Sequence, residues 1–198
     1  MPLARPRITI KLLLLLVLCV GIYLWVWLRA REEGPIARTN ARRRELRYGS
    51  PTARAAAAQA LGDMGMQAGP GGGEGLGWAV RNDKDARVRL IAVRALGQVG
   101  GGMPTTAEAL VVAVKDDDER VRAEAAGLLP LMSAFPGVNE AITRALRDPS
   151  ADVRRLAASG LGMALADDAT VEKALFALRG DPDESVRAAA VRSLLARA

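Results

Sequence analysis

The chain has no histidine, one cysteine and few aromatic residues, and these shortages exclude several classes of function. Without histidine there is no imidazole to bind a metal ion, to act as a general base or to complete a catalytic triad. The single cysteine, Cys19, cannot form a disulfide within the chain, so cysteine usage does not indicate a redox compartment. Phe, Trp and Tyr make up 4% of the residues, and the abundance of Ala, Leu and Val favours close helix packing.

Two segments resemble ligand-binding motifs but lack residues that those motifs need. The stretch 69–77 holds six glycines without the Gly-Lys-Ser/Thr ending or preceding strand of a phosphate loop, so we expect a flexible loop and at most a short helix over 76–81. The acidic run 116–119 lacks the ligand spacing of a calcium loop and is expected to be a solvated turn. We predict no catalytic residue, no cofactor and no metal site, and therefore no enzymatic activity.

What the chain does contain is one phrase repeated five times, in which Val-Arg is followed by Ala four positions and Leu eight positions after the valine. The first copy has Ala53 in place of the valine. The arginines of the phrase lie at 54, 89, 122, 154 and 187, which gives steps of 35, 33, 32 and 33 residues. Self-similarity at this period is typical of a stacked solenoid.

Each copy is expected to form two helices joined by a turn. In 106–132, an apolar stripe with helical spacing runs from Ala107 to Val114, charged residues interrupt it, and a second stripe runs from Val121 to Leu129. The same layout recurs over 138–163 and 169–196. The predicted fold is all-α, a short α-solenoid (α-α superhelix) of about five helix pairs. The arginine-rich 36–47, without an apolar stripe, is interpreted as a polar cap or a stalk.

The repeated phrase resembles the HEAT-like repeats of the phycobilisome-lyase type. The resemblance rests on an Asp followed by Val-Arg-x-x-Ala-Ala-x-Ala-Leu-Gly, seen best at Asp83–Gly97, with related phrasing at Asp148–Gly162 and Asp181–Leu195. It covers about residues 50–198. The resemblance implies a solenoid whose second helices line a concave face, and it does not imply lyase activity because this repeat serves many functions.

An aspartate precedes the valine by five positions in four copies, in step with the arginines. Short acidic side chains there can close the turn and cap the second helix. We expect the arginines and aspartates to pair between adjacent repeats, the alternative being a ladder of anion-binding groups. The predicted ladder comprises Asp83, Arg89, Asp116, Arg122, Asp148, Arg154, Asp181 and Arg187.

Positions two, three and six after the valine vary in type and fall opposite the core stripe. Some are apolar where a solvated face would be polar, and arginines lie at the margin, which fits a protein-binding surface. Packing between repeats is the alternative interpretation, and the two stay open. The candidate contact residues are Leu90, Ile91, Arg94, Glu124, Arg155, Leu156, Ser159 and Arg192.

These observations predict a membrane-anchored scaffold or adaptor that binds a protein partner through the concave face. The alternative is a cofactor lyase or another enzyme-associated subunit built on the same repeat. Val191, Leu194 and Leu195 lack a polar cap, so a second copy of the chain is a further candidate partner. Nucleic acid is disfavoured, because residues 48–198 hold 18 basic and 19 acidic residues.

The anchor is predicted from the apolar run 8–28, in which Thr9 and Lys11 are the polar residues. Twenty-one helical residues span about 30 Å, the thickness of a bilayer core. Tyr23, Trp25 and Trp27 gather at one end, as at a membrane interface. A cleaved signal peptide is the alternative, although its apolar region would be shorter and Leu28-Arg29-Ala30 fits a cleavage site poorly.

The predicted organisation is a basic tail over 1–7, a transmembrane helix over 8–28, a basic juxtamembrane segment over 29–49 and the repeat domain over 50–198. This places the chain in the cell membrane as a single-pass protein. Seven Lys and Arg residues after the run, against Arg5 and Arg7 before it and Lys11 near its start, favour a cytoplasmic repeat domain, while the short basic tail argues the other way, so the side stays open. The five arginines of 38–47 are a solvated flank or contact anionic headgroups.

Overall fold

The computed structural model describes residues 10–100, 104–162 and 169–197, and all regular structure in these ranges is helical, with eleven α-helices and three short 3-10 helices. The chain forms two compact units, Met1–Arg38 and Thr39–Ala198. The all-α prediction is therefore confirmed for the described residues. The second unit begins at Thr39, eleven residues before the predicted start of the repeats at 50.

The first unit contains α1 (Ile10–Glu33) and the start of α2 (Pro35–Tyr48). None of the helices in the described part of the chain has the length and apolar character that a bilayer crossing needs. The prediction of a transmembrane helix over 8–28 and of a single-pass location in the cell membrane is therefore wrong.

The predicted contact of residues 8–28 with the lipid bilayer depended on this helix, and no described helix supports it. The predicted basic tail, 1–7, lies outside the described residues. The predicted juxtamembrane segment, 29–49, is helical over the end of α1 and through α2.

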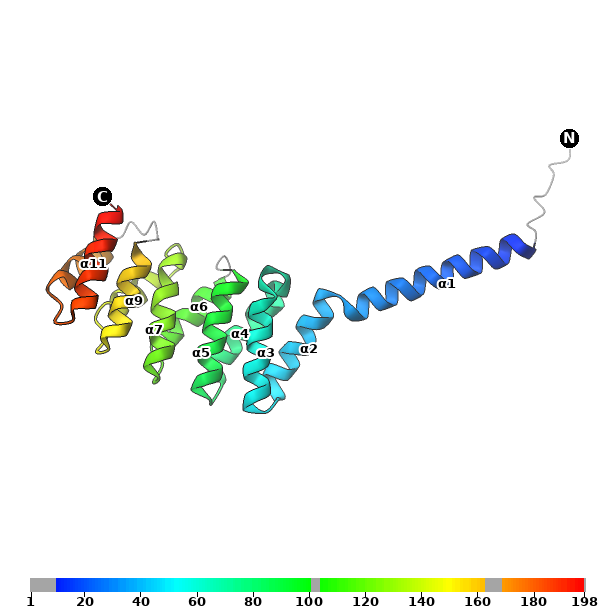
Figure 1. The fold of residues 1–198 in the computed structure, drawn as a ribbon, viewed down its shortest axis with the longest axis horizontal. Coiled ribbons are helices and arrows are strands. Elements are labelled where there is room, and N and C mark those ends of the chain that lie inside the picture. The colour runs from blue at the N-terminus through cyan, green and yellow to red at the C-terminus, as the bar shows by residue number, and fades with distance from the viewer. Residues whose placement is uncertain (1–9, 101–103, 163–168, 198) are drawn as a thin grey trace, which may run out of the picture. The chain divides into compact units, whose positions relative to one another are not determined.

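In the second unit, first and second helices alternate along the chain. The first helices are α2 from Thr39 onward, α4 (Gly69–Asn82), α6 (Pro104–Ala113), α8 (Val138–Ala145) and α10 (Ala169–Ala177). The second helices are α3 (Pro51–Asp63), α5 (Ala86–Val99), α7 (Glu119–Leu128), α9 (Ala151–Leu161) and α11 (Glu184–Arg197). Figure 1 shows the second helices side by side in chain order, as a solenoid requires. The 3-10 helices are η1 (Gly65–Ala68), η2 (Leu129–Met132) and η3 (Leu178–Gly180).

The second helices begin at short polar turns, and the structure refines how these turns work. The ladder aspartate closes the turn: an Asp83 carboxylate oxygen accepts the backbone N–H of Asp85 at 2.9 Å. The helix cap is the residue two positions later, since Asp85 accepts the N–H of Arg87 at 2.8 Å. Ser50 caps α3 by accepting the N–H of Ala53 at 3.2 Å. Turn closure and capping are therefore divided between two residues, because one short side chain cannot reach both N–H groups.

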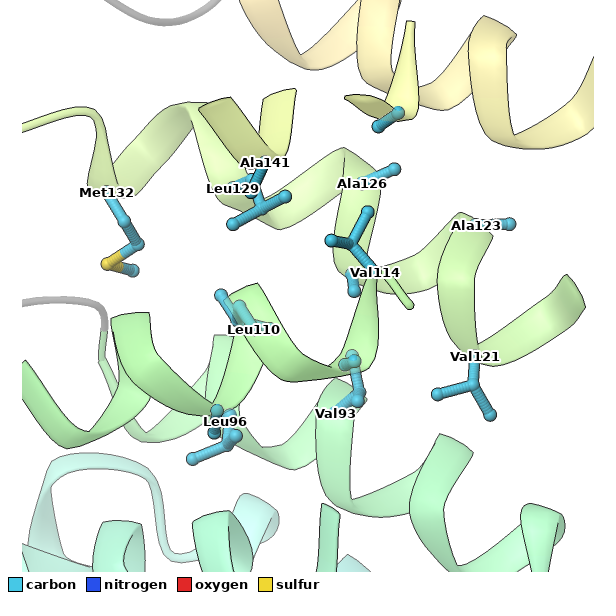
Figure 2. Packing of buried hydrophobic residues seen from close by; sticks show 14 of the residues in the cluster. Val93, Leu96, Leu110, Val114, Val121, Ala123, Ala126, Leu129, Met132 and Ala141 are labelled. Atoms are coloured by element: carbon cyan, nitrogen blue, oxygen red, sulfur yellow. The ribbon is translucent and has the colours of Figure 1, made fainter. Parts of the chain in front are cut away.

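The core is one continuous cluster that runs through the repeats from Leu46 to Ala190. The alanine four positions after the valine is fully buried in every repeat, and so is the leucine at the eighth position in the first four repeats. Figure 2 shows Leu96 of α5, Leu110 of α6 and Leu129 of η2 in the same interior. Burial of each leucine contributes about 1.5–3 kcal/mol of transfer free energy, so this continuous core holds successive repeats together.

Glycines let neighbouring second helices approach closely. A Cβ atom on Gly160 of α9 would lie 2.7 Å from the carbonyl oxygen of Gly127 of α7. Directly after α9, Gly162 lies against Ser193, whose buried hydroxyl donates to the carbonyl of Ala158 at 2.6 Å. The backbones therefore meet where a larger residue would hold the helices apart.

The glycine-rich stretch 69–77 forms the first half of α4, so the prediction of a flexible loop is wrong. Gly69 has a φ of 60°, Pro70 follows it at the first turn, and Leu76 is fully buried. A Cβ on Gly75 would lie 3.0 Å from Arg43 of α2. Tertiary packing outweighs the low helix propensity of glycine here, because the missing side chains make room for α2.

The arginine-rich segment before α3 acts as a cap on the first repeat. Thr39 and Leu46 of α2 are buried, and the Thr39 hydroxyl donates to the carbonyl of Ala68 at 3.3 Å. Of the two interpretations that the sequence left open, a polar cap describes residues 39–48, whose two buried side chains cover the end of the core.

Candidate functional site

Four arginine–aspartate pairs link each repeat to the next. In each pair the Nε and Nη2 atoms of the arginine donate to the two carboxylate oxygens of the next repeat's aspartate. The shortest distances are 2.7 Å for Arg54–Asp83, 2.7 Å for Arg89–Asp116, 2.9 Å for Arg122–Asp148 and 2.7 Å for Arg154–Asp181. Such forked pairs are stronger than single hydrogen bonds and fix the relative geometry of the two groups.

The third nitrogen of each arginine binds the turn that precedes its own helix. Nη1 of Arg89 donates to the carbonyls of Asp83 at 3.0 Å and Lys84 at 3.3 Å. Arg122 and Arg154 make the equivalent bonds. Each of these guanidinium groups therefore binds two successive turns and uses all three of its nitrogens to do so. The geometry supports a structural ladder rather than a row of anion sites.

The electrostatics of the ladder agree with this role. Burial works to raise the pKa of Asp83, but hydrogen bonds from Arg54 and from the Asp85 N–H outweigh it and lower the pKa. At Asp181, the hydrogen bond from Arg154 is the main cause of a lowered pKa. The lowered pKa values of Asp83 and Asp181 favour the ionised carboxylates that accept both bonds of the fork.

Arg187 differs from the other four arginines. Its Nη1 makes the usual bonds to the carbonyls of Asp181 at 2.8 Å and Pro182 at 3.0 Å. Within the described residues, no carboxylate pairs with its other two nitrogens. Nearby on α11, Val191 and Leu195 are exposed, and a second copy covering this end stays a prediction.

The candidate contact residues lie on α5, α7, α9 and α11 and are exposed or half-buried, and we call the solvent-facing surface of these helices and of α3 the second-helix face. A groove of about 320 Å³ opens between α3 and α5. Ala55, Ala56 and Ile91 contribute its apolar side chains, and Gln59 and Arg87 its polar margin. Ile91 is the predicted contact residue that lines this groove.

Other predicted residues make contacts within the face. Arg94 of α5 pairs with Glu124 of α7 at 3.0 Å, so these two side chains join adjacent repeats on an exposed surface. Arg155 pairs with Asp152 one turn earlier at 2.9 Å. Such exposed pairs contribute about 0–1 kcal/mol each, so they leave the charges available to a partner.

The apolar candidates serve partly to pack repeats together. Leu90, Ile91 and Leu156 are half-buried against the core. A Cβ on Gly127 would lie 3.8 Å from the Cβ of Leu156, which places Leu156 over the preceding repeat. Ser159 is half-buried and Arg192 exposed, and neither lines the groove between α3 and α5.

Sequence reasoning missed part of this groove. Arg87 precedes the repeated phrase by one position, and Ala55, Ala56 and Gln59 come from the first copy, where small side chains gave no sign of a contact surface. The available signal was the Asp85 turn, which places Arg87 at the edge of α5. Among the described residues, no group of acidic or cysteine side chains is arranged to hold a metal ion.

Comparisons with known proteins agree with this architecture. A family model for HEAT repeats matches residues 73–132 and 138–197. A designed armadillo repeat protein in complex with the peptide (KR)4 has a TM-score of 0.61 at 19% identity, covering 85% of this chain and 84% of that chain. An engineered protein has a TM-score of 0.57 at 23% identity, covering 80% and 78%.

A third solved structure, the complex of CpcE and CpcF of phycocyanin lyase from Nostoc sp. PCC7120, has a TM-score of 0.58 at 23% identity, covering 82% of this chain and 99% of that chain. No curated protein matches the chain. At these identities the likeness is one of fold. The predicted resemblance to HEAT-type repeats is thereby confirmed.

Proposed function

We propose that this chain, which belongs to the HEAT-repeat family, is a scaffold that binds a protein partner through the second-helix face. The observation that carries the proposal is the groove between α3 and α5, where apolar side chains lie between polar ones on a framework held by the ladder. Rigid sites bind with less loss of conformational entropy, so the clamped repeats favour a preorganised docking surface.

Two of the similar structures support this proposal because each is a complex with another polypeptide. The designed armadillo repeat protein is in complex with a peptide, and CpcE is in complex with CpcF. Binding of polypeptides therefore occurs on this architecture. The partner of the present chain would contact Ile91 in the groove and extend along the face toward Arg94, Glu124 and Leu156.

The proposal is tested by blocking the groove without opening the core. Ala56 is exposed at the groove, so Ala56→Arg fills it while the buried alanines stay in place. We expect this variant, and Ile91→Asp, to lose the partner that the wild-type chain captures by proximity crosslinking. The matched control is Val112→Asp, which places a charge on an exposed apolar residue of α6 in the other helix layer.

Helical content measured by circular dichroism must stay unchanged in all three variants. If Ala56→Arg and Ile91→Asp retain the same crosslinked partner as the wild type and Val112→Asp, the second-helix face is not the docking surface. The alternative function, a cofactor lyase or other enzyme-associated subunit, stays open. It rests on likeness of fold, and no residue of the described chain favours it.

A further inference from the structure

A groove of about 590 Å³ lies between α2 and α4, in the layer of first helices. Its charged side chains are unequal in number, with Arg43, Arg44, Arg47 and Arg81 against Glu74. We call this surface, together with Trp78, the basic groove. A cluster of one sign in a concave site concentrates ligands of the opposite charge.

Arg43 lies against α4 at positions where α4 has glycines in place of larger residues. Cβ atoms on Gly71 and Gly75 would lie 3.2 Å from its Nη1 and 3.0 Å from its Cγ. Its Nη2 pairs with Glu74 at 3.3 Å. The glycines lower the helix propensity of α4, but they also leave the space in which the Arg43 side chain lies.

Arg47 is held by an aromatic ring. Its guanidinium carbon lies 5.0 Å from the centre of the Trp78 ring, within the range of a cation–π contact. The half-buried Trp78 thus fixes a cation one helical turn from Arg43. Arginines that are already ordered lose less side-chain entropy when they bind a carboxylate.

The other two arginines of the groove are exposed. Arg44 on α2 and Arg81 on α4 have no carboxylate partner among the described residues. The basic groove therefore combines two positioned cations with two that have free hydrogen-bond donors. Such a set matches a ligand with several carboxylates rather than a single small anion.

We propose that the basic groove binds an acidic peptide segment of a partner protein in an extended conformation. Arg43 and Arg47 are four residues apart on a helix, a rise of about 6 Å. Alternate residues of an extended chain are about 6.6–6.8 Å apart, so carboxylates at i and i+2 match this spacing. The occupant is a Glu- or Asp-containing strand with acidic side chains on one edge.

Charge and geometry favour such a peptide over nucleic acid. Residues 48–198 hold 18 basic and 19 acidic residues, so the repeats carry no excess of positive charge that would favour a phosphate backbone beyond the groove. Arg47 covers a face of Trp78, which leaves that face closed to base stacking.

The test measures fluorescence anisotropy of a labelled Glu-Ala-Glu-Ala-Glu peptide with the full chain at low salt. Arg44→Glu/Arg81→Glu changes two exposed, unpaired residues and is expected to weaken binding by about 100-fold, because two attractions become repulsions. The matched control, Arg147→Glu/Lys173→Glu, makes the same change in net charge at exposed positions outside the groove. We expect it to change affinity by less than about 3-fold, since distant surface charges are screened.

A second variant separates positioned arginines from bulk charge. Gly75→Ala leaves the net charge unchanged and favours the helix, but its Cβ would lie 3.0 Å from the Cγ of Arg43 and would shift that side chain slightly, so we expect a loss of affinity of about 3- to 10-fold. The proposal is overturned if the arginine double variant binds the peptide like the wild type. It is equally overturned if a duplex DNA of equal charge binds more tightly than the peptide and displaces it.

Discussion

Arg89 and Asp116 face each other across the boundary between two repeats, with Nε to Oδ2 at 2.7 Å and Nη2 to Oδ1 at 2.8 Å. The Asp116 carboxylate also accepts the N–H of Asp118 at 2.9 Å, and Arg89 also binds the carbonyl of Asp83. One side-chain pair therefore joins the turn before α5, the helix α5 itself and the turn before α7. This relation explains why both residues recur at a fixed offset in the sequence.

Removing one partner of this pair should be costly. We expect Arg89→Ala to lower the free energy of unfolding by about 3–5 kcal/mol, because it leaves the carboxylate of Asp116 largely buried without its cation. The measurement is urea denaturation followed by circular dichroism. The neighbouring exposed residue provides the control, since Arg87→Ala should change the same free energy by about 0.5 kcal/mol or less. Equal effects of the two substitutions would contradict the structural role of the ladder.

The ladder should make stability depend on acidity. Because the folded-state pKa values of Asp83 and Asp181 are lowered, the unfolded chain binds more protons, and stability falls as the pH drops below about 4. Asp118, whose pKa is lowered to about 2 chiefly by its hydrogen bond from Arg120, extends this window downward. Thermal unfolding between about pH 6 and pH 2 measures the effect.

The variant Asp181→Asn tests one arginine–aspartate pair of the ladder, Arg154–Asp181. It should be less stable than the wild type near neutral pH and should lose less further stability on acidification, because the amide does not titrate in this range. Parallel pH curves for the wild type and Asp181→Asn would show that this pair does not contribute to the acid transition.

The buried leucines of the core should make the largest contributions to the free energy of unfolding. Leu129 is fully buried and Leu195 is 72% exposed, so they form a matched pair in residue type. We expect Leu129→Ala to cost about 2–5 kcal/mol through lost transfer free energy and a residual cavity. Leu195→Ala should change stability by about 0.5 kcal/mol or less, measured in the same denaturation experiment. A large loss at Leu195 would instead indicate that a second copy of the chain covers this end in solution.

Two glycines near the ends of second helices should respond in opposite directions to the same substitution. Gly160→Ala places a Cβ 2.7 Å from the carbonyl oxygen of Gly127, so we expect a loss of about 1–3 kcal/mol from overpacking. Gly127→Ala meets Leu156 at 3.8 Å, an ordinary contact, and should stabilise the chain by up to about 1 kcal/mol through helix propensity. Differential scanning calorimetry of the two variants measures both signs, and a stabilised Gly160→Ala would contradict the close helix approach.

Local sequence patterns were enough to predict some features of this protein, whereas others depended on tertiary contacts. The spacing of Val88, Ala92 and Leu96 sufficed to place a buried stripe on a helix, because helical periodicity and burial are properties of a short segment. The apolar run 8–28 misled for the same reason: composition alone suggested a bilayer span, which the described helices do not provide.

The candidate sites depended on contacts between segments distant in sequence. Ile91 could be named from its position in the phrase, but the groove that it lines also needs Ala56 and Gln59 of α3. The basic groove could not be predicted from the sequence, because the glycines of 69–77 favour a loop. Their packing role is evident only from the contact with Arg43 of α2.

The sequence by itself determined the repeat period, the helix pairs, the buried positions and the residue types of the ladder, because each follows from residue spacing within a copy or from the recurrence of that spacing between copies. Tertiary structure alone decided that α4 is a helix, that Arg54 reaches Asp83 and that α2 caps the first repeat. These features depend on how closely neighbouring backbones approach, and that distance is set by the packing of side chains from different repeats.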